Sequence, residues 1–180
     1  MLAGLSATYG FTPVAEAQFF SQSTCKLLRP LDETTRQAYR DSIVEFAVKN
    51  KPRYLGIGIE VNVLYEKSPA DFDAFVGFFS EVYEAIKEKS PDTNVFTVFQ
   101  LEKMKGFQGG LFGGANGNAE WSLLDRFPDT DMVAFTTYPC LVFKSPSAIP
   151  DGYYTEIAAH TTKPVAFTEV GWYSAADIPG

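Results

Sequence analysis

Two glutamates, Glu60 and Glu169, offer the clearest chemistry in this sequence. Each lies at the downstream end of a continuous apolar run, over 54–62 and 163–172. Such runs are typical of parallel strands covered on both faces, and catalytic groups of α/β proteins gather at the carboxyl ends of these strands. Two carboxylates brought together there could supply the nucleophile and the general acid/base for cleavage of a glycosidic bond.

Length, composition and charge narrow the class of protein. A chain of 180 residues, 46% hydrophobic and 21% charged, is typical of one globular domain, so residues 1–180 are interpreted as a single domain. The net charge of −7 argues against a nucleic-acid partner and against docking on an anionic membrane. No apolar run reaches the roughly 18 residues of a membrane span. A neutral substrate fits this charge better.

Metal and cofactor patterns are missing from the sequence, and we expect neither a metal nor a cofactor. His160 is the single histidine, which excludes multi-histidine metal sites and leaves a carboxylate-bound cation as the open alternative. His160 itself is interpreted as solvent-facing or helix-capping. The glycine-rich run 106–118 matches neither phosphate-binding fingerprint and is interpreted as a loop, with a lid over the substrate as the functional alternative. Cys25 and Cys140 are interpreted as unpaired small hydrophobic residues.

Helical and strand patterns alternate from about residue 32, which indicates repeated βα units. The first helix is predicted over 33–49 with Asp32 as its cap, and the second begins at Pro69 with Ser68 as its N-cap. The expected buried face of the first helix is Tyr39, Ile43, Phe46 and Ala47, and that of the second is Phe72, Phe75, Val76, Phe79, Tyr83 and Ile86. The later predicted elements are strands over 94–100, 132–138 and 164–169 and short helices over 121–126 and 153–160.

The spacing of the strands predicts the fold class. Strand starts near 55, 95, 132 and 165 are 40, 37 and 33 residues apart, close to the roughly 30 residues per unit of a (β/α)8 barrel. Four strands are clear and a fifth fits within the first thirty residues, which is too few to close eight. We therefore predict an α/β fold that is a partial or truncated (β/α)8 TIM barrel, about strands 3/4 to 7. A doubly wound α/β domain with unrelated glutamates is the alternative.

Three motifs resemble those of a known group of enzymes. They are Ile-Gly-Ile-Glu-Val-Asn (57–62), Thr-Thr-Tyr-Pro (136–139) and Phe-Thr-Glu-Val-Gly-Trp (167–172). Their order and spacing are similar to those of the retaining (β/α)8-barrel glycoside hydrolases with catalytic glutamates after strands 4 and 7, a clan that includes β-galactanases, cellulases and mannanases. The resemblance spans roughly residues 33–174. It implies that Glu60 is the general acid/base, Glu169 the nucleophile, and Tyr138 the strand-6 tyrosine near the nucleophile.

The chain departs from this group beside the acid/base residue. Those enzymes usually have an asparagine immediately before it, whose amide binds the sugar 2-hydroxyl, whereas this chain has Ile59. Asn62, on the same side of the expected strand as Glu60, is the candidate substitute. Trp172 is a candidate platform for stacking on a pyranose ring, with a place in the core as the alternative. The predicted substrate-binding residues are thus Asn62, Tyr138 and Trp172.

The sequence predicts a glycoside hydrolase that cleaves a β-linked poly- or oligosaccharide by a retaining double displacement. The alternative is a carbohydrate-binding or inactive glycosidase-like protein. Because a partial barrel leaves open strand edges and an uncovered apolar face, we predict self-association, most simply as a two-fold homodimer. The first residues lack the basic flank of a signal peptide, and we make no prediction of the cellular compartment.

Overall fold

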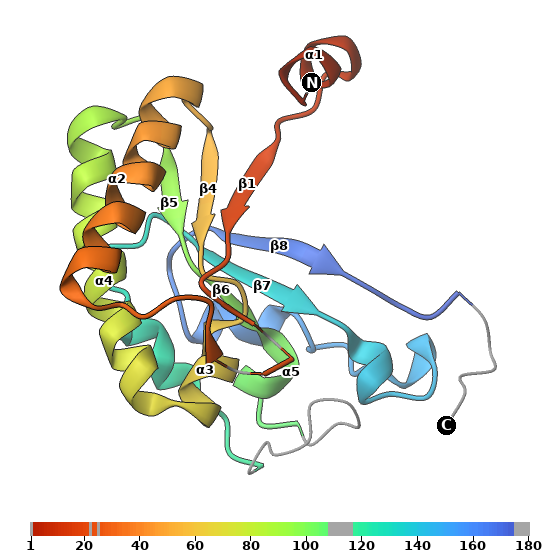
Figure 1. The fold of residues 1–180 in the computed structure, drawn as a ribbon. Helices are drawn as coiled ribbons and strands as arrows, with labels where there is room; N and C mark the ends of the chain where they lie inside the picture. Colours follow the sequence, from red (N-terminus) through yellow and green to blue (C-terminus); the bar gives the residue numbers. More distant parts are fainter. Residues whose placement is uncertain (1, 22, 25, 108–116, 175–180) are drawn as a thin grey trace.

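A computed structural model describes residues 2–21, 23–24, 26–107 and 117–174, and its fold is α/β (Figure 1). The first parallel sheet has the order β1-β4-β5 and consists of β1 (Val14–Ala17), β4 (Tyr54–Ile57) and β5 (Asn94–Phe96). The second has the order β6-β7-β8 and consists of β6 (Val98–Gln100), β7 (Val133–Thr137) and β8 (Val165–Val170). A small antiparallel hairpin is formed by β2 (Phe20–Ser21) and β3 (Lys26–Leu27). The strand expected in the first thirty residues is β1.

The described residues form three small sheets and no barrel, so the prediction of a partial (β/α)8 TIM barrel is wrong. The parallel pairing is divided at Thr97, because β5 pairs with β4 whereas β6, which follows directly, pairs with β7. At this point the Thr97 hydroxyl and the Val98 N–H both donate to the carbonyl of Gly58, at 3.2 and 3.1 Å. The chain thereby leaves one sheet and enters the next. The doubly wound alternative is not seen either, since neither parallel sheet reverses its strand order.

Two long helices, α2 (Glu33–Asn50) and α4 (Pro69–Lys89), lie side by side against the strands (Figure 1). The shorter α-helices are α1 (Leu2–Tyr9), α3 (Val61–Lys67) and α5 (Leu101–Met104). The 3-10 helices are η2 (Trp121–Arg126), η3 (Pro139–Leu141), η4 (Pro146–Ala148) and η5 (Thr155–Ala159). The short helices expected over 121–126 and 153–160 are therefore 3-10 turns. Among the described helices, none combines the length and apolar character needed to cross a membrane.

The starts of the two long helices were predicted correctly, although their caps differ. The Asp32 side chain accepts a hydrogen bond from the Thr35 N–H at 2.9 Å, which satisfies one of the free donors of the first turn of α2. Ser68 precedes α4, but its hydroxyl donates to the Asp71 carboxylate at 2.7 Å and does not cap the backbone. Pro69 begins α4, where its missing N–H is not needed.

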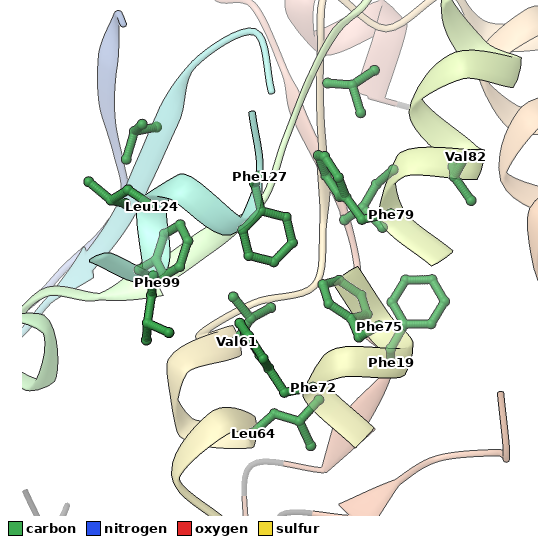
Figure 2. Close-up of a cluster of buried hydrophobic side chains, with 14 of the residues drawn as sticks. Phe19, Val61, Leu64, Phe72, Phe75, Phe79, Val82, Phe99, Leu124 and Phe127 are labelled. Carbon is green, nitrogen blue, oxygen red and sulfur yellow. The ribbon is translucent and has the colours of Figure 1, made fainter. Parts of the chain in front are cut away.

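A phenylalanine-rich core fills the space between the helices and the sheets (Figure 2). The Phe127 ring is central, with the rings of Phe72 and Phe79 edge-on to it at centroid distances of 5.9 and 5.2 Å. On α2 the prediction for Phe46 is wrong, because this side chain is 42% exposed and Val44 is buried in its place. On α4 the buried stripe also includes Phe78 and Val82, which the sequence pattern missed.

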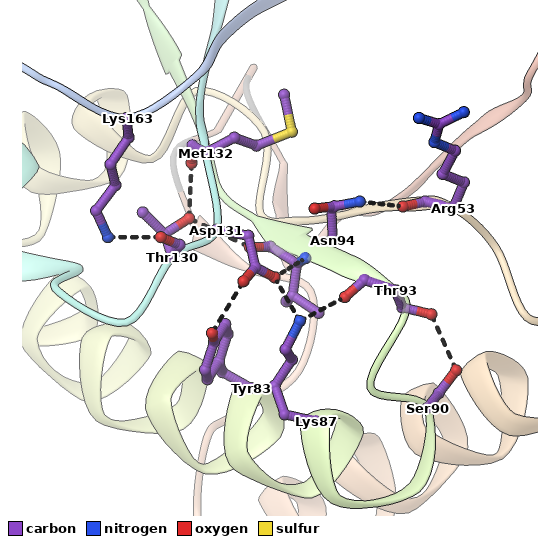
Figure 3. A network of polar contacts seen from close by, with 11 residues as sticks. Arg53, Tyr83, Lys87, Ser90, Thr93, Asn94, Thr130, Asp131, Met132 and Lys163 are labelled. Carbon is purple, nitrogen blue, oxygen red and sulfur yellow. Dashed lines mark hydrogen bonds and ion pairs between the residues drawn. The ribbon is translucent and has the colours of Figure 1, made fainter.

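A polar network fixes α4 to the amino ends of β5 and β7 (Figure 3). The Asp131 carboxylate accepts hydrogen bonds from the Tyr83 hydroxyl and the Lys87 ammonium, both at 3.0 Å, and from the Val95 N–H at 2.7 Å. Burial and the neighbouring Asp131 raise the pKa of the Tyr83 phenol to about 12. These contacts lie at the strand ends opposite to those near Glu60 and Glu169. This end of the fold is thus fastened by partly buried, charge-assisted hydrogen bonds.

The outer strands leave apolar surface uncovered. On β8, Val165 and Phe167 are exposed and Val170 is 69% exposed, while Val14 of β1 is exposed on the other sheet. Residues of both sheets, including Val14 and Val165, line a cavity of about 410 Å³. Exposed apolar area is unfavourable by roughly 25 cal/mol per Å². The unpaired N–H and C=O groups of an edge strand can also form hydrogen bonds with a strand of another chain.

We therefore expect the chain to self-associate, most simply as a two-fold dimer through this surface. Light scattering at micromolar concentration should give about twice the mass of one chain. The substitution Val170→Lys should shift the population toward monomer, whereas the matched control Val48→Lys, on an exposed position of α2, should not. A wild-type protein that is monomeric at every concentration would contradict the expectation.

Candidate active site

Glu60 is held in a left-handed turn between β4 and α3. Gly58 has φ 78° and Glu60 has φ 58°, and the helix begins directly afterwards at Val61. A non-glycine residue in this conformation is unfavourable by roughly 1–2 kcal/mol, and such strain concentrates at functional sites. The turn directs the glutamate out of the path that the strand would have taken.

The Glu60 carboxyl lies in a buried, polar environment. Its side chain is 5% exposed, and its Oε1 accepts a hydrogen bond from the Thr136 hydroxyl at 2.6 Å. Burial raises the pKa of Glu60 above its usual value, and the negative charges of Glu169 and Glu102 raise it further. The Thr136 hydrogen bond and the charge of Lys103 act in the opposite direction. A carboxyl with a raised pKa is suited to hold and deliver a proton.

Glu169 has a more open environment on β8. It is partly exposed, and its Oε2 accepts a hydrogen bond from the Tyr138 hydroxyl at 2.5 Å. This hydrogen bond, together with burial, raises the pKa of the Tyr138 phenol to about 12. The tyrosine is thus a neutral donor at physiological pH, and it fixes one oxygen of the carboxylate.

Thr136 links the two glutamates. It pairs in register with Glu169 across β7 and β8, and its hydroxyl donates to Glu60. The charge of Glu169 also raises the pKa of Glu60. The structure therefore brings together Glu60, Glu169 and Tyr138 of the sequence-predicted site residues.

Asn62 is not presented to a ligand, which corrects its expected role. The strand predicted over 54–62 ends at Ile57, and Asn62 belongs to α3. Its side chain is 1% exposed, and its amide donates to the Gln100 carbonyl at 3.0 Å and accepts from the Gln100 N–H at 2.8 Å. Asn62 thus ties α3 to β6 and has no free face for a sugar hydroxyl.

Trp172 lies at the surface directly after β8. It is 37% exposed, so the alternative that it belongs to the core does not hold, and Tyr173 beside it is exposed as well. Both aromatic side chains are within four residues of Glu169 in the chain. An exposed tryptophan at this place is suited to stacking on a sugar ring.

Sequence reasoning missed three polar residues around the site. Glu16 of β1 is partly buried, and burial and the charge of Glu169 raise its pKa while the Thr168 hydroxyl lowers it. Gln18 accepts from the Ile59 N–H and donates to the Ile59 carbonyl, both at 3.2 Å, and so supports the turn before Glu60. Glu102 is buried at the start of α5. The only sequence signal for these residues was their position next to short apolar runs.

The remaining candidate features of the sequence are a metal group, the cysteines, the histidine and the glycine-rich run. Within the described residues, no group of three or more histidine, cysteine, aspartate or glutamate side chains is arranged to hold a metal ion. Cys140 is a free thiol, and Cys25 lies outside the described residues. His160 is exposed and stacks on Trp121 at a centroid distance of 4.2 Å. Most of the glycine-rich run, residues 108–116, lies outside the described part of the chain.

No protein-family model and no curated protein matches the chain. The resemblance of its three motifs to retaining glycoside hydrolases therefore stays a prediction. The functional assignment depends on the geometry around Glu60 and Glu169.

Glu60→Gln should make the protein more stable at neutral pH. A raised folded-state pKa means that the charged carboxylate is less favourable in the folded than in the unfolded state. The stability that Glu60 contributes is therefore fully present below its unfolded pKa, where it is protonated, and is lost as the pH rises through its folded pKa. Glutamine keeps an acceptor for Thr136 and removes the charge. We expect a gain of about 0.5–2 kcal/mol in the free energy of unfolding at pH 7.5.

Urea unfolding at pH 4 and pH 7.5 measures this effect. The gain should shrink strongly at pH 4, which lies below the unfolded pKa of a glutamate, because Glu60 is then mainly protonated in both states. Glu45→Gln, at an exposed carboxylate of α2, is the matched control. Equal differences at the two pH values would count against a raised pKa of Glu60.

Gly171→Ala should weaken the contact between Tyr138 and Glu169. A Cβ at position 171 would lie 2.4 Å from Cε1 of the Tyr138 ring, so the ring must move. We expect the pKa of the Tyr138 phenol to fall from about 12 toward its ordinary value. Tyrosine ring-carbon NMR titration, assigned with Tyr138→Phe, reports this change, and Gly152→Ala, which has open space, is the control. An unchanged titration would mean that the ring does not depend on the glycine.

Proposed function

We propose that this protein is a glycoside hydrolase that cleaves a β-linked poly- or oligosaccharide by a retaining double displacement. One observation carries the proposal: Thr136 joins two interacting carboxyls that have different surroundings. Glu60 is buried with a raised pKa, whereas Glu169 is partly exposed and bound by a phenol. Pairs of carboxyls with contrasting environments divide the acid and nucleophile roles in glycosidases.

The first step forms a glycosyl-enzyme. Glu169 attacks the anomeric carbon, and the bond to the leaving-group oxygen breaks as Glu60 delivers its proton to that oxygen. Tyr138 binds Oε2 of Glu169, so Oε1 is the oxygen that forms the new bond. The protonated state that the surroundings of Glu60 favour is the state this step requires.

The second step returns the enzyme to its starting state. Glu60, now a carboxylate, takes a proton from water, whose oxygen attacks the anomeric carbon and breaks its bond to Glu169. Two displacements on the same carbon retain the anomeric configuration. Water and the two glutamates supply every proton and bond partner in the two steps, so the proposed reaction needs no cofactor.

A carbohydrate-binding protein without turnover is the second candidate. It is favoured by the exposed Trp172 and Tyr173, which follow β8 and could hold sugar rings by stacking. In that case Glu60 and Glu169 would contribute hydrogen bonds to sugar hydroxyls and no bond would break. The acidic chain, with a net charge of −7, suits a neutral sugar in either case.

A screen on aryl β-glycosides and β-linked polysaccharides tests the proposal. The wild type should release a product whose anomeric configuration, followed by proton NMR before mutarotation, matches that of the substrate. The double variant Glu60→Gln/Glu169→Gln should be inactive, and Glu45→Gln, at an exposed carboxylate of α2, should match the wild type. Sugar binding by calorimetry without turnover would favour the second candidate, and inversion of configuration would overturn the double displacement.

A further inference from the structure

Glu102 is a buried carboxylate that the two displacement steps do not use. It lies directly after β6 and is 2% exposed. Its Oε1 accepts hydrogen bonds from the Tyr153 hydroxyl at 2.6 Å and the Thr137 hydroxyl at 2.7 Å. The Gln100 side-chain amide and the Tyr138 N–H both donate to its Oε2, the latter at 3.2 Å. Four donors on two oxygens are satisfied by the ionised, acceptor-only form of a carboxylate.

Three consecutive residues at the end of β7 each donate a side-chain hydrogen bond to a different carboxyl. The donors and their acceptors are Thr136 to Glu60, Thr137 to Glu102 and the Tyr138 hydroxyl to Glu169. Successive side chains of a strand point to opposite faces, so Thr137 reaches Glu102 on the face away from Thr136. Glu102 therefore holds the strand end from behind the candidate site.

We propose that Glu102 is a positioning residue for the glycosidase site, an inference that rests on the proposed function. It binds the Thr137 side chain and the Tyr138 N–H, and it thereby fixes the backbone from which the hydroxyls of Thr136 and Tyr138 reach the two catalytic glutamates. The Tyr153 hydroxyl in turn holds Glu102 in place. Burial and Glu102 both raise the pKa of Tyr153, which keeps this phenol a donor.

Glu102 also contributes through its charge. The titratable groups that act on Glu60 are Glu169 from β8 and Glu102 and Lys103 from α5. The two carboxylates raise the pKa of Glu60, while Lys103, whose ammonium also pairs with Glu66 at 2.5 Å, lowers it. Removing the charge of Glu102 should therefore lower the pKa of Glu60 and release its proton at a lower pH.

The test is a carboxyl-carbon NMR titration of Glu60, assigned with Glu60→Gln, in wild type and Glu102→Gln. We expect the pKa of Glu60 to fall in Glu102→Gln and to stay unchanged in the control Glu45→Gln, at an exposed carboxylate of α2. On a substrate that the wild type cleaves, Glu102→Gln should lower kcat by about 10- to 100-fold through misplacement of the catalytic groups, with little change in KM. The alkaline limb of its pH profile should move to lower pH.

A second, milder variant keeps the proposal testable if Glu102→Gln does not fold. Tyr153→Phe removes one donor and leaves the charge of Glu102 in place, so the strand end loosens while the ring still fills the core. The pKa of the Tyr138 phenol should then fall from about 12, because its bond to Glu169 weakens. Unchanged pKa values of Glu60 in Glu102→Gln, or of Tyr138 in Tyr153→Phe, would overturn the positioning role. A wild type that cleaves no glycoside would overturn the proposed function, whatever these titrations give.

Discussion

Glu169→Gln should have no measurable turnover on any glycoside, whereas Glu60→Ala should lose kcat/KM, which reports the first step, only where the leaving group is poor. Glutamine at position 169 cannot form the glycosyl-enzyme, so both steps stop. Alanine at position 60 removes the proton donor, which matters little for a dinitrophenolate leaving group and costs about 10²–10⁴-fold in kcat/KM for an alkyl or sugar leaving group.

Kinetics on a series of aryl glycosides with graded leaving-group pKa values measure this contrast. The logarithm of kcat/KM should depend steeply on leaving-group pKa in Glu60→Ala and weakly in the wild type. Added azide should restore turnover in Glu60→Ala as a β-glycosyl azide, because a small anion replaces water in the second step without needing a general base. Full activity of Glu169→Gln would remove this residue from the nucleophile role.

Gly58→Ala should destabilise the fold by about 2–5 kcal/mol, the sum of a left-handed alanine and an overpacked contact. Gly58 has φ 78°, and a Cβ there would lie 2.5 Å from Cζ of Phe75 and 2.7 Å from Cγ1 of Val61. Both neighbours are fully buried in the core and have little room to move. The same change disturbs the turn that places Glu60.

Urea unfolding followed by tryptophan fluorescence measures the loss of stability. Gly152→Ala is the matched control, because position 152 is exposed, has no positive φ and meets no atom closer than 4.0 Å. It should change the free energy of unfolding by no more than about 0.5 kcal/mol. A Gly58→Ala protein as stable as the control would mean that the turn can rearrange.

Local signals in the sequence predicted the elements that depend on local chemistry. The start of α2 follows from Asp32, and the start of α4 follows from Pro69. The pairing of Glu60 with Glu169 was predicted from their places after two apolar runs, since parallel strands bring their carboxyl ends to the same edge. These inferences needed only the spacing of residues along the chain.

The parts that were missed depend on contacts between distant residues. The run 94–100 has the pattern of a single strand, in which a threonine is common, so nothing in it marks the change of partner at Thr97, which is made by hydrogen bonds to Gly58. Asn62 was predicted to lie on a strand because a left-handed turn is usually marked by glycine or asparagine, whereas here it is formed by a glutamate, Glu60. Glu102 has the sequence of a solvated helix start, and its burial depends on Tyr153 and Thr137 from later segments.

Because the parallel strands are divided at Thr97, the two glutamates of the proposed reaction belong to different sheets. Glu60 follows β4 of the first sheet, and Glu169 belongs to β8 of the second. The separation of their carboxyls therefore depends on the angle at which one sheet continues into the other. About 5–5.5 Å suits direct attack by a carboxylate, and roughly 6.5–9.5 Å admits a water between the two groups. In the proposed reaction, the bend at Thr97 would thus contribute to the spacing on which the stereochemistry of the product depends, although Thr97 lies on neither strand that leads to a glutamate.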